Sequence, residues 1–275
     1  GHESEPLEKA EEPKKVMVIG GGVAGLSAAF IAKERGHEVT LYEAGDVLGG
    51  NMRLAAYPPG KGDITNMIRS YIHRCQKDGV KIVMNCEVTP ELIKEEKPDS
   101  VIIATGSKTL ILPIEGIDNP AIIHGSDLLD GKRAVGKKVL VVGGGMVGCE
   151  TAAFLGEQEH DVTVIEFRDT VGADVIHEHR VYLMKDFEDY GIKEITGAKV
   201  CKFYEDGVEY ETADGVRHES RGYDSVILSM GFRNYNPLEE KIKDLVPETH
   251  VIGDAIRARR ALDATKEAYE VASRI

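Results

Sequence analysis

Three glycines followed by an acidic residue form the first group of residues that could bind a ligand. Gly20, Gly22 and Gly25 have G-x-G-x-x-G spacing, and Glu43 follows about 20 residues later. The first glycine of such a motif permits a tight turn, the second lets the backbone approach a pyrophosphate, and the third lets a helix pack on a strand. A carboxylate at the position of Glu43 can accept hydrogen bonds from both hydroxyls of an adenosine ribose. The chemistry indicated is dinucleotide binding.

The elements needed to position these residues occur in the required order. Apolar residues 16–19 predict a buried strand, and small apolar side chains after the glycines predict a helix that ends near Gly36. Residues 39–42 predict a second strand that ends at Glu43. Glycine-rich turns also occur as ordinary helix-capping loops, but the full strand, turn, helix, strand and acid favour the dinucleotide site.

A second copy of this unit begins at Val139. One constant offset, 143 minus 20 or 123 residues, relates the glycines and the acid of the two copies. The second set is Gly143, Gly145, Gly148 and Glu166. Two copies in one chain predict two dinucleotide sites.

Further elements are predicted between and after the copies. Apolar periodicity, glycines and prolines indicate helices near residues 64–76, 91–96, 173–190 and 262–275, and strands near residues 80–85, 100–105, 225–229 and 251–252. Asp206-Gly207 and Asp214-Gly215 predict hairpin turns in a polar β-meander.

Composition and charge restrict the partners of the chain. Its 275 residues suffice for two domains, and a net charge of -13 would repel nucleic acid and an anionic membrane surface. No apolar run approaches the roughly 18 residues of a membrane span, and no signal peptide is recognisable, so we expect a cytoplasmic protein. Residues 1–13, which begin Gly-His and are rich in Glu, Lys and Pro, are expected to be a cloning scar and linker from a longer protein.

The cysteines do not form a recognisable redox or metal motif. Cys75, Cys86, Cys149 and Cys201 are scattered, and no two form a C-x-x-C pair. The sequence therefore encodes no local redox disulfide, zinc site or iron-sulfur site, and no metal ligands are assigned. Cys149 is predicted to be buried beneath the second glycine turn.

The two glycine units resemble those of flavoproteins with two dinucleotide-binding domains. Residues 104–106 (ATG) and 252–255 (IGDA) add to this resemblance. It implies an α/β fold of two Rossmann-like domains, with the NAD domain inserted into the FAD domain. The expected boundaries are 14–110 plus 245–275 for the FAD-binding domain and 111–244 for the NAD(P)-binding domain.

A narrower resemblance is carried by four segments. Residues 48–51 (LGGN), 58–61 (PPGK), 144–151 (GGMVGCET) and 229–233 (SMGFR) are similar to the C-terminal half of NADH:flavin oxidoreductases related to Old Yellow Enzyme. That branch includes 2-enoate reductases, 2,4-dienoyl-CoA reductases and bile-acid flavin oxidoreductases. Its full-length members carry FMN and a 4Fe-4S centre on an N-terminal barrel, which would be this chain's partner in the same polypeptide. Asn51 departs from the commoner glutamine, and residues 234–235 depart from the usual proline-asparagine.

The resemblance implies cofactor-binding residues and no catalytic triad, because hydride passes directly between stacked nicotinamide and flavin rings. The FAD contacts implied are Gly20, Gly22, Ala24, Gly25, Glu43, Gly50, Asn51, Lys61, Val88, Thr105, Gly106, Gly253 and Asp254. The NAD(P) contacts implied are Gly143, Gly145, Met146, Val147, Gly148 and Glu166. Lys61 could instead be a solvated loop lysine. A carboxylate after a buried strand, such as Asp254, needs a partner because its desolvation is costly.

The pyridine nucleotide is predicted to be NADH rather than NADPH. Glu166 ends its strand where a 2′-phosphate would lie and would repel it, although Arg168 could pair with such a phosphate. The function expected is an electron-input module that passes hydride from NADH to FAD for a barrel that reduces an activated C=C bond. The alternatives are a nucleotide-binding relic that holds ADP or FAD without oxidising NADH, and a stand-alone NADH oxidase or ferredoxin reductase.

Overall fold

The computed structural model describes residues 6–275. Residues 1–5, the first part of the expected scar and linker, lie outside the described residues. The chain forms two compact units: the first contains the described residues through Ala56, Asp63–Lys108 and Arg233–Ile275, and the second contains Tyr57–Gly62 and Thr109–Phe232. The chain therefore leaves the first unit after residue 108 and returns at residue 233, compared with the expected boundaries at 110–111 and 244–245. The segment Tyr57–Gly62 is a further part of the second unit.

The first unit is built on a five-stranded sheet. Every adjacent pair of strands is parallel, and Val18 lies between Leu41 and Ile102 in the register. In spatial order the strands are β15 (Glu248–Val251), β4 (Ser100–Ile103), β1 (Lys15–Ile19), β2 (Glu38–Tyr42) and β3 (Lys81–Val83). Parallel strands buried on both faces explain the continuous apolar runs in β1 and β4.

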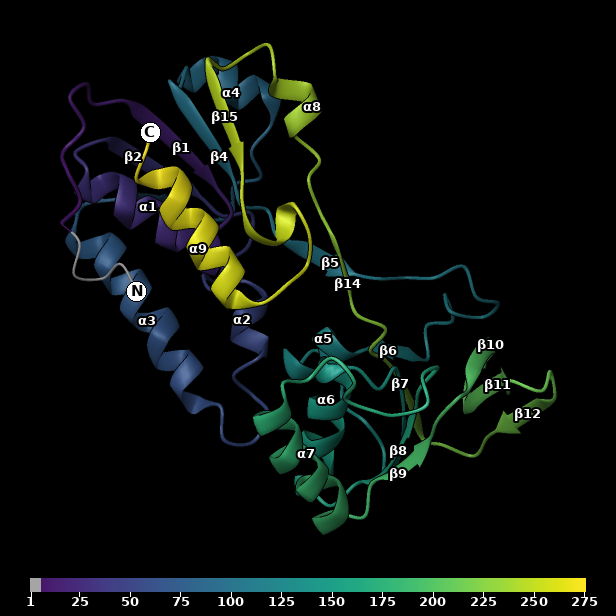
Figure 1. Ribbon diagram of the computed structural model, residues 1–275. Helices are drawn as coiled ribbons and strands as arrows, with labels where there is room; N and C mark the ends of the chain where they lie inside the picture. The colour runs from purple at the N-terminus through teal and green to yellow at the C-terminus, as the bar shows by residue number, and fades with distance from the viewer. Residues whose placement is uncertain (1–5) are drawn as a thin grey trace. The chain divides into compact units, whose positions relative to one another are not determined.

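Helices cover both faces of this sheet. On one face α1 (Val23–Glu34) lies beside α9 (Ala261–Ala272), as Figure 1 shows. The four-residue spacing of Ala264, Ala268 and Ala272 places small buried side chains on one side of α9, so the two helices approach closely. The helix α3 (Gly62–Lys77) packs on the same face of the sheet. The helices α4 (Pro90–Glu96) and α8 (Glu239–Ile242) pack on the opposite face. Two short elements complete the unit: α2 (Asn51–Leu54) and the 3-10 turn η1 (Gly253–Ala255).

The second unit repeats this plan. In spatial order its parallel strands are β6 (Ile122–His124), β13 (Ser225–Leu228), β7 (Lys138–Val142), β8 (Asp161–Ile165) and β9 (Lys193–Ile195). One face packs on α6 (Met146–Glu157) and α7 (His177–Asp189), and α5 (Gly125–Leu129) follows β6. The antiparallel meander β10 (Lys199–Tyr204), β11 (Gly207–Glu211) and β12 (Arg217–Ser220) supplies Phe203 and Val208 to the core on the other face. The predicted α/β fold of two Rossmann-like units, one inserted into the other, is confirmed.

Two short strands lie where the chain passes between the units. β5 (Ser107–Thr109) pairs with β14 (Phe232–Asn234), and the Leu110 amide donates a 2.9 Å hydrogen bond to the Gly231 carbonyl. The outgoing and returning segments are thus held together at the junction.

The helix predicted near residues 173–190 begins later than expected. It starts at His177, and residues 166–176 form a loop that contains Gly172 at φ +62°. Gly172 takes part in a turn that continues beyond the predicted start, because residues 171–175 are turns and a bend.

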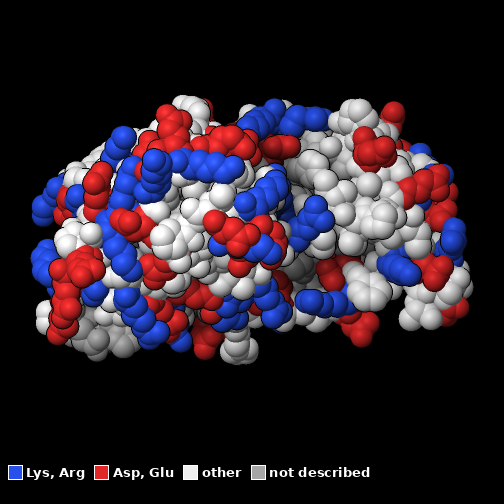
Figure 2. All heavy atoms as spheres, turned by 90° about the horizontal axis from the view of Figure 1, so that it is seen from above, with Lys and Arg blue, Asp and Glu red and all other residues white. Residues whose placement is uncertain are grey.

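The surface in view has mixed charge. Figure 2 shows acidic and basic side chains interspersed over it, despite the net charge of -13.

Residues 6–13 are held against the first unit. They form neither helix nor strand, but the Ala10 amide donates to the Arg35 carbonyl at 2.9 Å. Among residues 6–275 no helix is long and apolar enough to cross a membrane.

Candidate functional site

The first glycine turn leaves space beside the start of α1. Gly20 has φ +109°, and a Cβ there would lie 2.3 Å from the Ala104 carbonyl oxygen. At Gly25 a Cβ would lie 1.9 Å from the Gly20 carbonyl oxygen, so the helix packs too closely for any side chain. A Cβ at Gly22 would meet nothing within 4 Å. The N-terminus of α1 can therefore be approached at Gly22, as a pyrophosphate requires.

Glu43 lies at the end of β2 with both carboxylate oxygens directed at backbone amides. Its Oε2 accepts a 2.6 Å hydrogen bond from the Gly21 N–H, and its Oε1 accepts a 2.7 Å bond from the Gly45 N–H. A carboxylate has about four acceptor positions, so ribose hydroxyls can still bind to it. The position of Glu43 fits its predicted role.

Residues far apart in the sequence meet at this turn. The Gly49 amide donates to the Gly21 carbonyl at 2.8 Å, and a Cβ on Gly50 would lie 3.1 Å from the Gly22 Cα. A Cβ on Gly253 would lie 3.0 Å from the Cβ of Ala24. The structure thus brings the predicted residues Gly50 and Gly253 to the start of α1.

A chain of polar side chains continues from this turn. Asn51 donates to the hydroxyl of Ser107 at 3.2 Å, and that hydroxyl donates to Asp254 Oδ2 at 2.9 Å. The other oxygen of Asp254 accepts a 3.0 Å bond from the Arg259 amide. The half-buried Asp254 carboxylate is therefore partnered, as its place after a buried strand requires.

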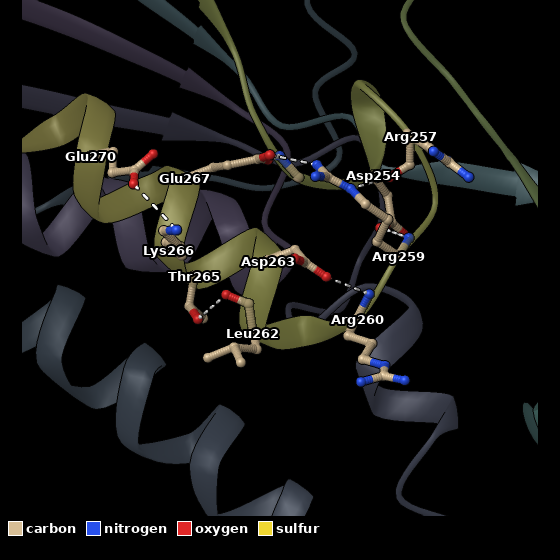
Figure 3. A network of polar contacts seen from close by, with 11 residues as sticks. Asp254, Arg257, Arg259, Arg260, Leu262, Asp263, Thr265, Lys266, Glu267 and Glu270 are labelled. Atoms are coloured by element: carbon tan, nitrogen blue, oxygen red, sulfur yellow. Dashed lines mark hydrogen bonds and ion pairs between the residues drawn. The ribbon is translucent and has the colours of Figure 1, made fainter. Parts of the chain in front are cut away.

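The loop before α9 is fixed by Glu267, which sequence analysis missed. Its carboxylate accepts from the Gly253 amide at 2.7 Å and from the Arg259 guanidinium at 2.5 Å. The hydrogen bond with Glu267 raises the pKa of Arg259. Figure 3 shows this network, together with the Arg260 amide donating to Asp263 at the start of α9. Glu267 escaped notice because it lies mid-helix, with no motif to single it out.

Three predicted FAD residues are engaged within the first unit. The Thr105 hydroxyl donates to the Tyr235 carbonyl at 2.5 Å, and the Tyr235 amide donates to the Gly106 carbonyl at 2.9 Å. Val88 is 5% exposed and belongs to the core on the α4 face of the sheet. Contacts of these residues with FAD stay predictions.

Lys61 differs from the other predicted FAD residues in belonging to the second unit. It belongs to the segment Tyr57–Gly62 of the second unit, where its ammonium group forms an ion pair with Glu150. His179 Nε2 lies 3.1 Å from the same Glu150 oxygen, and Glu150 is only 5% exposed. The FAD contact predicted for Lys61 stays untested, and the role of Glu150 as its partner was not anticipated.

The second glycine turn repeats the first. A Cβ on Gly143 would lie 2.4 Å from the Ser229 carbonyl oxygen, and one on Gly148 would lie 1.8 Å from the Gly143 carbonyl oxygen. Glu166 accepts from the Gly144 amide at 2.6 Å and from the Arg168 amide at 2.9 Å. Met146 and Val147, the remaining predicted NAD(P) residues, form the first turn of α6. The arrangement is suited to an adenosine ribose and a pyrophosphate.

Cys149 is structural. It is fully buried, its Sγ lies 3.2 Å from the Gly144 carbonyl oxygen, and burial raises the pKa of its thiol to about 12. The predicted burial beneath the second glycine turn is confirmed. All four cysteines are free thiols.

Comparison with known protein families identifies the chain. The model of the pyridine nucleotide-disulphide oxidoreductase family matches residues 14–252. The chain belongs to this family. Members of the pyridine nucleotide-disulphide oxidoreductase family bind FAD and NAD(P)H, which agrees with two glycine turns that both fit a dinucleotide.

Similar members of the family are longer proteins, and this chain matches only part of each. The chain is 35% identical to cinnamate reductase of Clostridium sporogenes and 34% identical to NADH oxidase of Thermoanaerobacter brockii, over 98% of its own length in both cases. It covers 40% and 42% of those proteins. A structure of 2-naphthoyl-CoA reductase superposes with a TM-score of 0.93 at 32% identity, covering 98% of this chain and 41% of that one. The predicted resemblance to enoate-reductase-type flavin oxidoreductases is confirmed, and the chain spans about two fifths of these relatives.

Proposed function

We propose that this chain is the electron-input module of a larger flavin oxidoreductase. It would hold NADH and FAD so that electrons pass onward to an iron-sulfur and FMN barrel, which reduces an activated C=C bond. The observation that carries the proposal is the match of nearly the whole chain to two fifths of cinnamate reductase and 2-naphthoyl-CoA reductase. The remaining three fifths of such an enzyme would supply the barrel.

The first unit would hold FAD. The start of α1 at Gly22 is open to a pyrophosphate, Glu43 would accept the ribose hydroxyls, and Asp254 would bind hydroxyls nearer the flavin. When bound, FAD supplies the hydride acceptor, and the protein contributes orientation and exclusion of water. The N-terminus of α9, which follows the fixed loop of Arg259 and Glu267, would stabilise negative charge nearby.

The second unit would hold NADH. Its glycines and Glu166 are arranged like the glycines and Glu43 of the first turn, and Glu166 directly follows β8, where its carboxylate would repel a 2′-phosphate. The match to a relative named NADH oxidase supports the same nucleotide. That name also supports a second candidate function, NADH oxidation with oxygen as the acceptor.

The test is the visible spectrum of the chain supplied with FAD and then with NADH in the absence of oxygen. The expected result is bound oxidised flavin that loses its colour on addition of NADH. A protein that stays colourless after FAD is added, or whose flavin NADH leaves oxidised, would instead be a nucleotide-binding relic. Ferricyanide should be reduced and a panel of 2-enoates left intact, whereas rapid oxygen consumption would favour the oxidase.

A further inference from the structure

Besides Glu166, the second glycine turn has a further carboxylate, that of Asp174, which lies at the start of the helix that follows the turn. Asp174 Oδ1 accepts a 2.9 Å hydrogen bond from the Met146 amide, the first N–H of the 12-residue helix α6. A Cβ on Gly145 would lie 3.3 Å from Asp174 Oδ2. The Asp174 side chain therefore covers the glycine and the amide that a pyrophosphate would approach.

The internal repeat shows what stands at this position in the first unit. The 123-residue offset relates β1 to β7, α1 to α6 and β2 to β8 without a shift. It continues into the following loop, where the Gly172 amide donates to the Gly144 carbonyl at 2.7 Å and the Gly49 amide donates to the Gly21 carbonyl at 2.8 Å. At the same offset Asn51 corresponds to Asp174.

The two corresponding residues behave differently. Asn51 is neutral, its amide donates to Ser107, and a Cβ on Gly22 would meet nothing within 4 Å. Asp174 is charged and bonded directly to the helix N-terminus. Among residues 6–275 no cation forms an ion pair with Asp174, and the nearby Arg180 instead donates to Thr170 and to the Val171 carbonyl.

We propose that Asp174 lowers and tunes the affinity of the second unit for the pyrophosphate of its pyridine nucleotide. The inference rests on the proposed function, because it concerns the NADH site. A bound pyrophosphate and the carboxylate would compete for the Met146 amide, and their negative charges would repel one another. The consequence is a nucleotide that binds and leaves readily, while the first unit, with Asn51, retains its dinucleotide.

A variant that removes the charge of Asp174 but keeps its hydrogen bond to the Met146 amide isolates the effect of charge on nucleotide affinity. The side-chain carbonyl oxygen of asparagine is an acceptor like a carboxylate oxygen, so Asp174→Asn can retain the bond to Met146. We expect NAD+ to bind Asp174→Asn about five- to tenfold more tightly than wild type, the size of one charge repulsion near the surface. The gain should shrink as salt is raised, because the interaction is exposed to solvent.

The experiment is calorimetric titration of the full chain with NAD+ and with ADP-ribose at low and high salt. Asp169→Asn is the matched control, since it removes one exposed negative charge from the same loop. Equal affinities of the Asp174→Asn and Asp169→Asn variants, or weaker binding by Asp174→Asn, would overturn the inference while leaving the proposed function intact. Failure of both wild type and Asp174→Asn to bind either ligand would overturn the proposed function as well.

The reciprocal change tests the same position in the first unit. Asn51→Asp would place a carboxylate on the first turn, and Asn51→Ala would remove the amide without adding charge. We expect Asn51→Asp to retain less FAD after gel filtration than Asn51→Ala. Equal retention by the two variants would show that charge at this position does not govern dinucleotide binding, contrary to the inference.

Discussion

The ammonium group of Lys61 is paired with the carboxylate of Glu150 inside the second unit. The Lys61 side chain is 19% exposed and that of Glu150 is 7% exposed, so water screens the pair only partly. His179 Nε2 is the other side-chain partner that the structure gives Glu150. Removing one member of such a pair leaves a poorly solvated charge without compensation.

Glu150→Gln is therefore expected to destabilise the second unit by about 2 kcal/mol, less than the roughly 3 to 5 kcal/mol of a fully buried pair, because the Lys61 side chain is partly exposed. Calorimetric melting should show a lower melting temperature, and hydrogen exchange should quicken in α6. The double variant Lys61→Met/Glu150→Gln should recover part of the loss because no unpaired charge remains. Glu157→Gln, an exposed change on the same helix, is the control, and a loss no larger than the control's would contradict the prediction.

Asp254 and Ser107 should contribute unequally to FAD retention. Asp254→Asn removes the charged acceptor and is expected to lower FAD affinity about tenfold, since hydrogen bonds to charged groups contribute roughly 1.5 to 3 kcal/mol. Ser107→Ala removes the 2.9 Å bond to Asp254 and the 3.2 Å bond from Asn51 but leaves the Asp254 carboxylate in place, so a smaller loss is expected. Fluorescence titration with FAD measures both, with Ser70→Ala on the exposed surface of α3 as control. Wild-type affinity in Asp254→Asn would remove Asp254 from the site.

Glu166 should make NADH the better reductant. We expect faster flavin reduction with NADH than with NADPH at equal low concentrations, because the carboxylate repels a 2′-phosphate. Glu166→Gln should narrow the difference several-fold, and adding Arg168→Ala should slow the remaining reaction with NADPH. Glu178→Gln, an exposed change on α7, should leave the ratio unchanged. Comparable rates with the two nucleotides in wild type would refute the preference.

The buried thiols should be inert in the folded chain. Burial raises the pKa of Cys75 to about 11 and that of Cys149 to about 12, so on the order of one thiol in a thousand or fewer is ionised at pH 8. A disulfide reagent should modify the partly exposed Cys86 and Cys201 first, and the other two only after unfolding.

The same pKa shifts give stability a definite pH dependence. The unfolded thiols titrate near pH 9, below their folded values, so unfolding releases protons above that pH. Their contribution to the free energy of unfolding is complete below about pH 9 and is lost as the pH rises toward 11 to 12. Cys149→Ala should reduce the fall in melting temperature between pH 8 and pH 10. An identical fall in that variant would contradict the assignment.

Local patterns made much of the fold predictable. Each glycine turn lies with its strands, helix and acid within about 30 consecutive residues, where periodicity and glycine spacing are informative. Lys61 shows where such patterns fail, because its partner Glu150 is 89 residues away and no local signal connects them.

Asp174 shows a different failure. The helical pattern was extended back to residue 173, which concealed a loop residue that caps another helix. The positive φ of Gly172 was not foreseen, since glycine also occurs within regular elements. Continuing the 123-residue offset beyond Glu43 and Glu166 pairs Gly49 with Gly172 and Asn51 with Asp174.

The division of the first unit along the chain has a consequence for synthesis. Its sheet is incomplete until β15 emerges, and the apolar face of α1 stays uncovered until α9 follows. The second unit, apart from Tyr57–Gly62, is finished at Phe232, more than a dozen residues before β15 begins. Domains generally fold as units while the ribosome is still translating. The inserted unit can therefore mature first on the ribosome, and the host unit closes last, when its final helix leaves the exit tunnel.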